Sequence, residues 1–249
     1  MKKTEIICGK NAVTELLRAG KRKCHEIFLA EGRNEHALAD LLHFAEAKKV
    51  TIHSIPRREL DKLSSLEKHQ GVAAKVEPFV YSDEKEVLRS ISGSNTLFLL
   101  LDGIIDPQNL GSLLRTAHQL GVDAVFLPKD NSAPIGPAAA KASAGAIEYL
   151  PIVQVVNLTR LLNVLKDKAF WVYGADASEE SRSLYTCDFK QGNVALVMGS
   201  EGKGMKRLVG KSCDFLVEIP MKGKLDSLNV SVAGAVILAE IMRQRIPSS

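Results

Sequence analysis

Residues 96–115 read TLFLLLDGIIDPQNLGSLLR, a continuous apolar run followed by a polar turn and then a helical pattern. Such a run is typical of a strand that is buried on both faces. After the turn, Leu110, Leu113, Leu114 and Ala117 recur at the spacing of one helix face. A strand followed by a helix is the repeating unit of a parallel α/β sheet, so this stretch predicts that fold class.

The same rhythm continues along the rest of the chain, where short apolar runs alternate with helical patterns. The runs lie at 122–127, 150–156, 170–174, 194–199 and 215–220. We therefore expect one parallel α/β domain over residues 96–249. Ligands in such sheets bind at the carboxyl ends of the strands, where loops lead into helices.

The first third of the chain predicts a smaller α/β domain over residues 1–78. Helices are expected at 11–18 and 35–49, strands at 25–30, 50–54 and 72–77, and a short helix after Pro56. The stretch 79–95 combines a charge cluster with Ser, Gly and Asn, and we interpret it as a linker that contains a helical turn.

Composition is that of an ordinary globular protein, with 45% hydrophobic and 25% charged residues in a chain of 249. The four cysteines, Cys8, Cys24, Cys187 and Cys213, form no C-x-x-C pair. We therefore expect no zinc or other metal site, and reduced thiols in a cytoplasmic protein. No apolar run reaches the roughly 18 residues that a membrane-spanning helix requires.

Charge is spread unevenly along the chain. The whole chain has 33 Lys and Arg against 29 Asp and Glu, which gives +4, whereas residues 1–75 alone hold 15 and 10, which gives +5. A basic segment joined to a nearly neutral body suggests a module that binds a polyanion. A difference of this size also falls within ordinary scatter, so charge alone does not establish a nucleic-acid partner.

Glycine-rich loops for phosphate binding are missing from the sequence. Neither G-x-G-x-x-G nor G-x-x-x-x-G-K-[ST] occurs, and the glycines of GSEGKG at 199–204 follow a different order. A cofactor without a pyrophosphate fits this absence, and S-adenosylmethionine is such a cofactor.

Three polar motifs follow apolar runs: DPQNLGSLLR at 106–115, LVMGSEGKGM at 196–205 and IPMKGKLDSLNVSVAGAVILAE at 219–240. Each has a simple structural alternative when it is taken alone. Asn109 would cap a helix, Arg115 would be a solvated arginine, and 199–204 would be a tight turn. Ser227 or Asn229 would likewise cap the last helix. The three together, in this order, favour a functional site.

This combination resembles the SpoU (TrmH) family of RNA ribose 2′-O-methyltransferases, in the SPOUT superfamily. The matching residues are Asp106, Pro107, Asn109, Gly111, Arg115, Met198, Gly199, Glu201, Gly202, Gly204, Ile219, Pro220, Met221, Ser227, Leu228, Asn229, Val230 and Ser231. GKNAVTELL and HQGVAAKV in the first third are similar to the family's substrate-binding domain of the L30e type.

The resemblance implies a deep trefoil knot in the C-terminal domain, an exception to the rule that chains avoid knots. It also implies a homodimer and S-adenosylmethionine as cofactor, with a guanosine of 23S rRNA as the expected substrate. The cofactor would be held by residues of the knot loops, namely Met198, Gly199, Ser200, Gly202, Ile219, Pro220, Met221, Ser227, Leu228 and Asn229.

The family's catalytic positions correspond here to Asn109, Arg115, Glu201 and Asn229. Arginine stays protonated in proteins, so a phosphate grip is a simpler role for Arg115 than that of a base. Glu201 would orient Arg115 or neighbouring donors, or would be an acid at a helix N-terminus. RNA-binding candidates in the basic first third are Lys21, Arg22, Lys23, Arg57 and Arg58, and each could equally be a solvated surface charge.

Two other functions compete with methyl transfer. One is a non-catalytic RNA-binding protein that keeps the fold, but the intact Asn109, Arg115, Glu201 and Asn229 argue against it. The other is a dinucleotide-dependent oxidoreductase, which the missing G-x-G-x-x-G disfavours.

Overall fold

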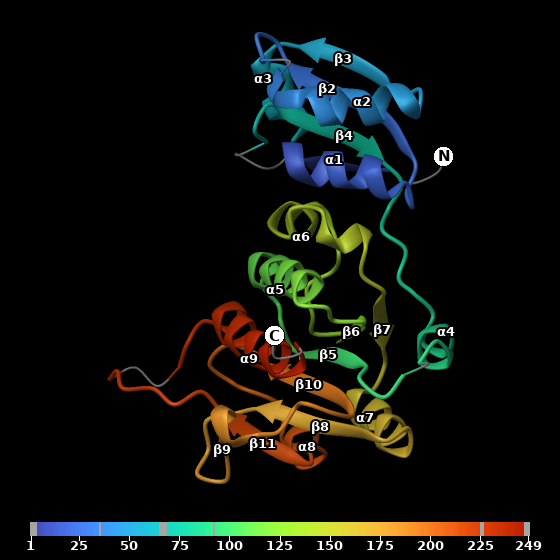
Figure 1. Cartoon of the computed structure of the whole chain (residues 1–249). Coiled ribbons are helices and arrows are strands. Elements are labelled where there is room, and N and C mark those ends of the chain that lie inside the picture. Colours follow the sequence, from blue (N-terminus) through green and yellow to red (C-terminus); the bar gives the residue numbers. More distant parts are fainter. Residues whose placement is uncertain (1–3, 35, 65–68, 92, 225–226, 247–249) are drawn as a thin grey trace. The chain divides into compact units, whose positions relative to one another are not determined.

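The computed structural model describes residues 4–34, 36–64, 69–91, 93–224 and 227–246. The chain divides into two compact units (Figure 1). Met1–Val80 and Pro134–Tyr149 form the first unit, while Tyr81–Ala133 and Leu150–Ser249 form the second. The chain first passes from one unit to the other after Val80, within the stretch 79–95 where the linker was expected. The later return of Pro134–Tyr149 to the first unit was not expected.

The first unit is a mixed sheet covered by helices. Its strands are β1 (Glu5–Cys8), β2 (Cys24–Ala30), β3 (Thr51–Ile55) and β4 (Val72–Val76), in the order β1-β4-β2-β3. Its helices are α1 (Lys10–Ala19), η1 (His36–Leu38), α2 (Ala39–Ala47), α3 (Arg57–Leu63), α6 (Pro137–Ala142) and η2 (Ala146–Glu148). β4 runs antiparallel to both β1 and β2, whereas β2 and β3 are parallel.

Most of the elements expected in the first unit are present, with two differences. Strand β1 was not expected, because its four residues are too few to show a clear pattern. The helix expected at 35–49 is split into η1 and α2, and Asn34 Oδ1 accepts from the backbone N–H of His36 at the start of η1. Glu35, at the start of that expected helix, lies outside the described residues.

A buried ion pair and a hydrogen bond join Pro134–Tyr149 to the rest of the first unit. The guanidinium of Arg22 donates to both carboxylate oxygens of Glu148, at 3.2 and 2.5 Å. It also donates to Glu5 at 2.7 Å, and its side chain is only 5% exposed. Tyr149 donates from its hydroxyl to Glu15 on α1. Arg22 therefore belongs to the interior of the unit.

Replacing Arg22 with methionine is expected to destabilise the protein by roughly 3–5 kcal/mol, because Glu148 would remain as a buried charge without its partner. Urea unfolding would measure the loss. Lys21→Met, at the exposed neighbouring position, is the matched control and should have little effect. Equal stability of the two variants would contradict a structural role for the Arg22–Glu148 pair.

The second unit is a parallel sheet, as the sequence analysis predicted. Its strands follow the order β7-β6-β5-β10-β8-β11-β9. They are β5 (Leu97–Asp102), β6 (Ala124–Pro128), β7 (Ile152–Val155), β8 (Phe170–Ala175), β9 (Arg182–Ser183), β10 (Asn193–Gly199) and β11 (Phe215–Glu218). All of β5 is buried, and Phe98 on it packs against Phe126 and Phe170.

Helices cover both faces of this sheet (Figure 1). They are α4 (Glu84–Arg89), α5 (Pro107–Gln119), α7 (Leu158–Asp167), η3 (Leu184–Thr186), α8 (Arg207–Lys211) and α9 (Val230–Arg245). α5 packs against α9 on one face, and residues of α7 and α8 join the core on the other. None of the helices in the described ranges is long and apolar enough to span a membrane.

The four cysteines are free thiols and none lies in a reactive setting. Burial raises the pKa of Cys24 to about 11 and that of Cys213 to about 12. Both groups are therefore protonated at neutral pH, and neither is a ready nucleophile or metal ligand.

Candidate active site

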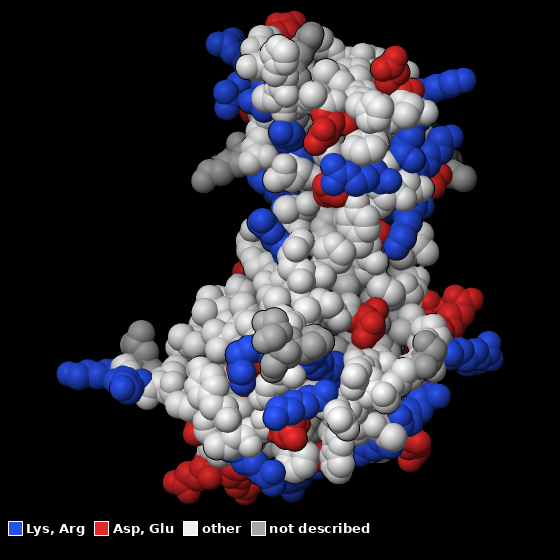
Figure 2. Space-filling view, in the orientation of Figure 1, with Lys and Arg blue, Asp and Glu red and all other residues white. Residues whose placement is uncertain are grey.

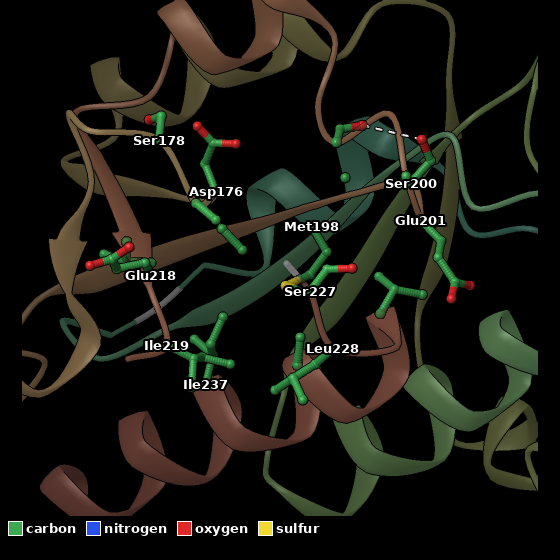
Figure 3. Close-up of a pocket in the computed structure, with 18 of the residues that line it drawn as sticks. Asp176, Ser178, Met198, Ser200, Glu201, Glu218, Ile219, Ser227, Leu228 and Ile237 are labelled. Atoms are coloured by element: carbon green, nitrogen blue, oxygen red, sulfur yellow. Dashed lines mark hydrogen bonds between the residues drawn. The ribbon is translucent and has the colours of Figure 1, made fainter. Parts of the chain in front are cut away.

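A cavity of about 570 Å³ opens at the carboxyl ends of the central strands of the second unit. The loops after β8, β10 and β11 and the start of α9 surround it (Figure 3). Its lining includes Ala175, Asp176, Ala177, Ser178, Met198, Gly199, Ser200, Glu201, Gly202, Lys203, Gly204, Val217, Glu218, Ile219, Met221, Ser227, Leu228, Val230, Ala233 and Ile237. The second and third motifs therefore meet here.

The first motif reaches this region through the start of α5. Asp106 caps the helix, because its carboxylate accepts from the backbone N–H groups of Gln108 and Asn109, and Pro107 occupies the first turn. The alternative that Asn109 is the cap is therefore wrong. With the cap supplied by Asp106, the Asn109 side chain is free to bond elsewhere.

Asn109 joins the three motifs. Its Nδ2 donates to Glu201 Oε2 at 3.2 Å, and its Oδ1 accepts from Asn229 Nδ2 at 3.0 Å. Asn229 Oδ1 in turn accepts from the backbone N–H of Ser231 and so caps α9. Asn229 thus has both the capping role and a bond to the first motif. These bonds could not be predicted from local sequence patterns, since Asn109 lies 92 positions from Glu201 and 120 positions from Asn229.

Gly199 allows the 200–204 loop to fold back over the end of β10. Ser200 and Gly204 exchange backbone hydrogen bonds at 3.0 and 2.9 Å. A Cβ atom at Gly199 would lie 2.3 Å from the carbonyl carbon of Gly204 and from the backbone nitrogen of Met205. Only glycine fits this close approach. Glu201 is therefore in a tight turn, since the next helix, α8, begins only at Arg207.

A second cavity, of about 740 Å³, lies beside the first and shares the 200–204 loop with it. It is lined by Asp102, Gly103, Ile104, Ile105, Asp106, Asn109, Asn131, Ser200, Glu201, Lys203, Gly204, Met205, Lys206 and Val230. Both cavities have volumes within the range of small-molecule sites. The Asn109–Glu201 bond therefore forms part of the wall of the second cavity.

Arg115 points away from the buried face of α5, as its phase in the helix predicted. Leu110, Leu113, Leu114 and Ala117 are fully buried, whereas Arg115 is exposed. It lines neither cavity, and it makes no hydrogen bond or ion pair with the described residues. Glu201 contacts Asn109 and does not orient Arg115 in this chain.

Most of the expected cofactor residues line the first cavity, although Pro220 and Asn229 do not. The loop after β8 also contributes to the site, although it was not expected to: it brings Asp176, Ala177 and Ser178 to the cavity. These residues directly follow the apolar run FWVYG, so their place at a strand end was the available signal. Leu225 and Asp226, within the third motif, lie outside the described residues.

The first cavity is acidic on balance. Asp176, Glu201 and Glu218 line it with carboxylates, and Lys203 is the cation among its described lining residues. Figure 3 shows Glu218 and Glu201 at opposite sides of the cavity, with Met198 between them. Ile219, Leu228 and Ile237 are among the apolar side chains of the wall. Such a cavity suits a ligand with an apolar ring and a net positive charge.

The residues expected to bind RNA fall into two groups. Lys21, Lys23, Arg57 and Arg58 are exposed on the first unit. Arg22 is buried, and its guanidinium is held by Glu148 and Glu5. The prediction that Arg22 contacts RNA phosphate is therefore wrong, because its side chain is internal.

Two family models match separate parts of the chain. Residues 96–239 match the SpoU rRNA Methylase family. The chain belongs to this family. Residues 6–82 match the model described as RNA 2′-O ribose methyltransferase substrate binding. The two matches together cover residues 6–82 and 96–239 and so reach both units.

Curated relatives match the SpoU-family chain over nearly its full length. The 23S rRNA (guanosine-2′-O-)-methyltransferase RlmB of Pseudomonas aeruginosa is 44% identical, with 99% of each chain covered. RlmB of Ralstonia nicotianae is 43% identical, with 98% of each chain covered.

Solved structures share the fold of the whole chain. A crystal structure of an RNA 2′-O ribose methyltransferase has a TM-score of 0.82 at 24% identity, covering 98% of this chain and 90% of its own. The SpoU methyltransferase AviRb from Streptomyces viridochromogenes, in complex with AdoMet, has a TM-score of 0.79 at 23% identity, covering 98% and 92%. The expected fold, a parallel α/β domain with a small substrate-binding domain, is therefore confirmed.

Proposed function

We propose that this protein transfers the methyl group of S-adenosylmethionine to a ribose 2′-hydroxyl of RNA, and that its substrate is a guanosine of 23S rRNA. The relatives named RlmB support the substrate. The observation that carries the chemistry is the Asn109 bridge, which joins the three family motifs beside a cavity of suitable size.

The volume and the charge of the first cavity suit S-adenosylmethionine. The cofactor combines an adenosine with a sulfonium and a zwitterionic amino acid, so its net charge is positive. Ile219, Leu228 and Ile237 offer apolar contact for the adenine, while Asp176 and Glu218 offer compensating negative charge. Because Gly204 passes directly over Gly199, backbone groups can approach the cofactor closely there.

The reaction forms a bond between the ribose 2′-oxygen and the methyl carbon while the carbon–sulfur bond breaks. The products are the methylated ribose, S-adenosylhomocysteine and the proton of the hydroxyl group. Alignment of oxygen, carbon and sulfur accounts for roughly 7–11 kcal/mol of the barrier in well-oriented reactions. Asn109, Glu201 and Asn229 would shape the place where the ribose is held. Arg115, always charged, would grip the phosphate of the target nucleotide.

RNA would be held by phosphate contacts from exposed cations of the first unit. Lys21, Lys23, Arg57 and Arg58 remain candidates for this role. Figure 2 shows Lys and Arg interspersed with Asp and Glu over the face in view, without a single basic patch. Several separate contacts along an RNA strand fit this distribution better than one deep phosphate site.

Charge reversal of Arg57 and Arg58 together should weaken RNA binding. The slope of the logarithm of the binding constant against the logarithm of the salt concentration should also become shallower, by the amount expected for about two lost phosphate contacts. Filter binding of a 23S rRNA fragment at several salt concentrations measures both effects. The control is reversal of Lys168 and Lys190, two exposed lysines of the second unit. If both double variants bound RNA equally, the cations of the first unit would have no special role.

We also propose that the active form is a homodimer in which Arg115 serves the partner's cofactor site, since it lines neither cavity of its own chain. Mixing an Arg115→Ala chain with a Gly199→Val chain tests this arrangement. A site shared between chains should recover about a quarter of wild-type activity after statistical exchange of subunits. No recovery in exchanged dimers would place Arg115 in its own chain's site.

The central test of the function is methylation of 23S rRNA from a strain that lacks this gene. Purified protein and labelled S-adenosylmethionine should place one methyl group on a guanosine ribose, located by mapping of 2′-O-methylation. Binding of the RNA without any methyl transfer would instead support the non-catalytic alternative.

A further inference from the structure

A buried carboxylate lies beside the active-site motifs and was not among the expected site residues. Asp102, the last residue of β5, has a side chain only 1% exposed. Its Oδ2 accepts from the backbone N–H of Lys206 at 2.8 Å, and its Oδ1 lies 3.1 Å from Lys206 Nζ. No hydrogen-bond donor among the described residues reaches Oδ1 with good geometry, so the ammonium group alone compensates that oxygen.

The Asp102–Lys206 pair fixes one end of the 200–204 loop. Asp102 on β5 is the direct neighbour of Gly199 on β10, where the loop leaves the sheet. Gly204 folds back over Gly199, and Lys206 then meets the Asp102 carboxylate. Both ends of the loop are therefore fastened to the same pair of strands.

This loop is the common wall of the two cavities. Ser200, Glu201, Lys203 and Gly204 line both of them. At its tip, Glu201 accepts from Asn109. A change in the position of Lys206 would therefore move Glu201 and alter the cofactor cavity and the neighbouring cavity together.

We propose that Asp102 is a positioning residue for methyl transfer, acting through Lys206 to hold the 200–204 loop against the cofactor. The proposal rests on the function proposed above. Asp102 does not touch the reacting atoms in this scheme. Its charge matters because it holds Lys206 by both the backbone N–H and the ammonium group, so that Glu201 stays within reach of Asn109.

The same sheet contains a comparable pair at the amino end of β11, where the Asp214 side chain is 23% exposed and lines neither cavity. Asp214 precedes β11; its Oδ2 accepts from the backbone N–H of Val172 at 2.9 Å, and its Oδ1 lies 2.7 Å from Lys166 Nζ. The chemistry is the same as in the Asp102–Lys206 pair, but Asp214 and Val172 lie toward the amino ends of β11 and β8. Loss of this pair should affect stability without affecting the cavities.

The experiment compares Asp102→Ala, Lys206→Met and Lys206→Arg with Asp214→Ala in the full-length protein. Calorimetry gives the affinity for S-adenosylmethionine, and single-turnover methylation at saturating RNA gives the rate. We expect Asp102→Ala to lose at least about tenfold in cofactor affinity and about 10²-fold in rate, the size of effect that a 1 Å misplacement causes. Lys206→Met should show the same pattern more weakly.

Lys206→Arg should have a cofactor affinity and a methylation rate near the wild-type values, because arginine keeps the ion pair with Asp102. Asp214→Ala should lower the melting temperature yet keep affinity and rate within about twofold of wild type. The inference is overturned if Asp102→Ala lowers only the melting temperature, or if Asp214→Ala reduces the rate equally. Should Asp102→Ala fail to fold, Asp102→Asn keeps the acceptor for the Lys206 N–H and tests the charge alone.

Failure of this inference and failure of the proposed function give different results. If the wild-type protein does not methylate RNA, the proposed function is wrong. The affinities of the four variants for S-adenosylmethionine can still be compared in that case, and they test the positioning role of Asp102. If the wild-type protein methylates RNA and all four variants match it, the function stands and the positioning role of Asp102 is wrong.

Discussion

Replacing Arg115 with alanine is expected to lower methyl transfer by on the order of 10²–10³-fold, the usual cost of removing one group that stabilises a transition state. Fold and cofactor affinity should stay near normal, because Arg115 is exposed and makes no hydrogen bond or ion pair with the described residues. The measurement is single-turnover methylation of an rRNA fragment at saturating RNA and S-adenosylmethionine, with calorimetry for the cofactor.

Two further variants sharpen this prediction. Arg115→Lys keeps the charge but loses the planar fork of donors, so a bidentate grip on phosphate should still fail. Gln119→Ala removes another exposed side chain one turn further along α5 and is the matched control. Near-normal rates for both Arg115 variants would show that this arginine is merely a solvated charge.

Substituting valine for Gly199 is expected to abolish cofactor binding. A Cβ atom alone would lie 2.3 Å from the backbone of Gly204 and Met205, which cannot move aside as a flexible side chain could. The 200–204 loop would have to leave its place over β10, and the cofactor cavity would lose that wall. Calorimetric titration with S-adenosylmethionine should then show a loss of affinity of at least about 100-fold, or roughly 3 kcal/mol.

The control for this substitution is Gly210→Ala in α8, where an added Cβ would meet only the end of the Met205 side chain at 4.0 Å. Gly199→Ala should already show most of the loss, since the clash begins at the Cβ atom. Unchanged affinity in Gly199→Val would mean that the cofactor binds elsewhere on the protein.

Much of the second unit could be predicted because its signals are local. A buried parallel strand such as β5 is a continuous apolar run, and α5 shows its buried face at regular spacing. Strand order is a different matter, since β10 lies between β5 and β8 although β6 and β7 come earlier in the chain. That order depends on packing between distant segments, and it was not predicted from the sequence.

In the candidate site, too, single residues could be identified from the sequence, whereas the contacts between them could not. Motif residues such as Asn109 and Asn229 were identified by resemblance, but their mutual hydrogen bond depends on the fold. Asp102 was overlooked because it reads as the polar end of an apolar run. Arg22 was misjudged because a basic tripeptide, KRK at 21–23, gives no sign that its middle residue turns inward to Glu148.

The excursion of Pro134–Tyr149 into the first unit has a consequence for biosynthesis. A ribosome that has released only the first 80 residues has not yet made the partners of Arg22 and Glu15, namely Glu148 and Tyr149. The amino-terminal unit therefore cannot reach its final packing until nearly 150 residues have emerged. A recombinant chimera that exchanges this unit between relatives would likewise have to transplant two separate pieces of sequence.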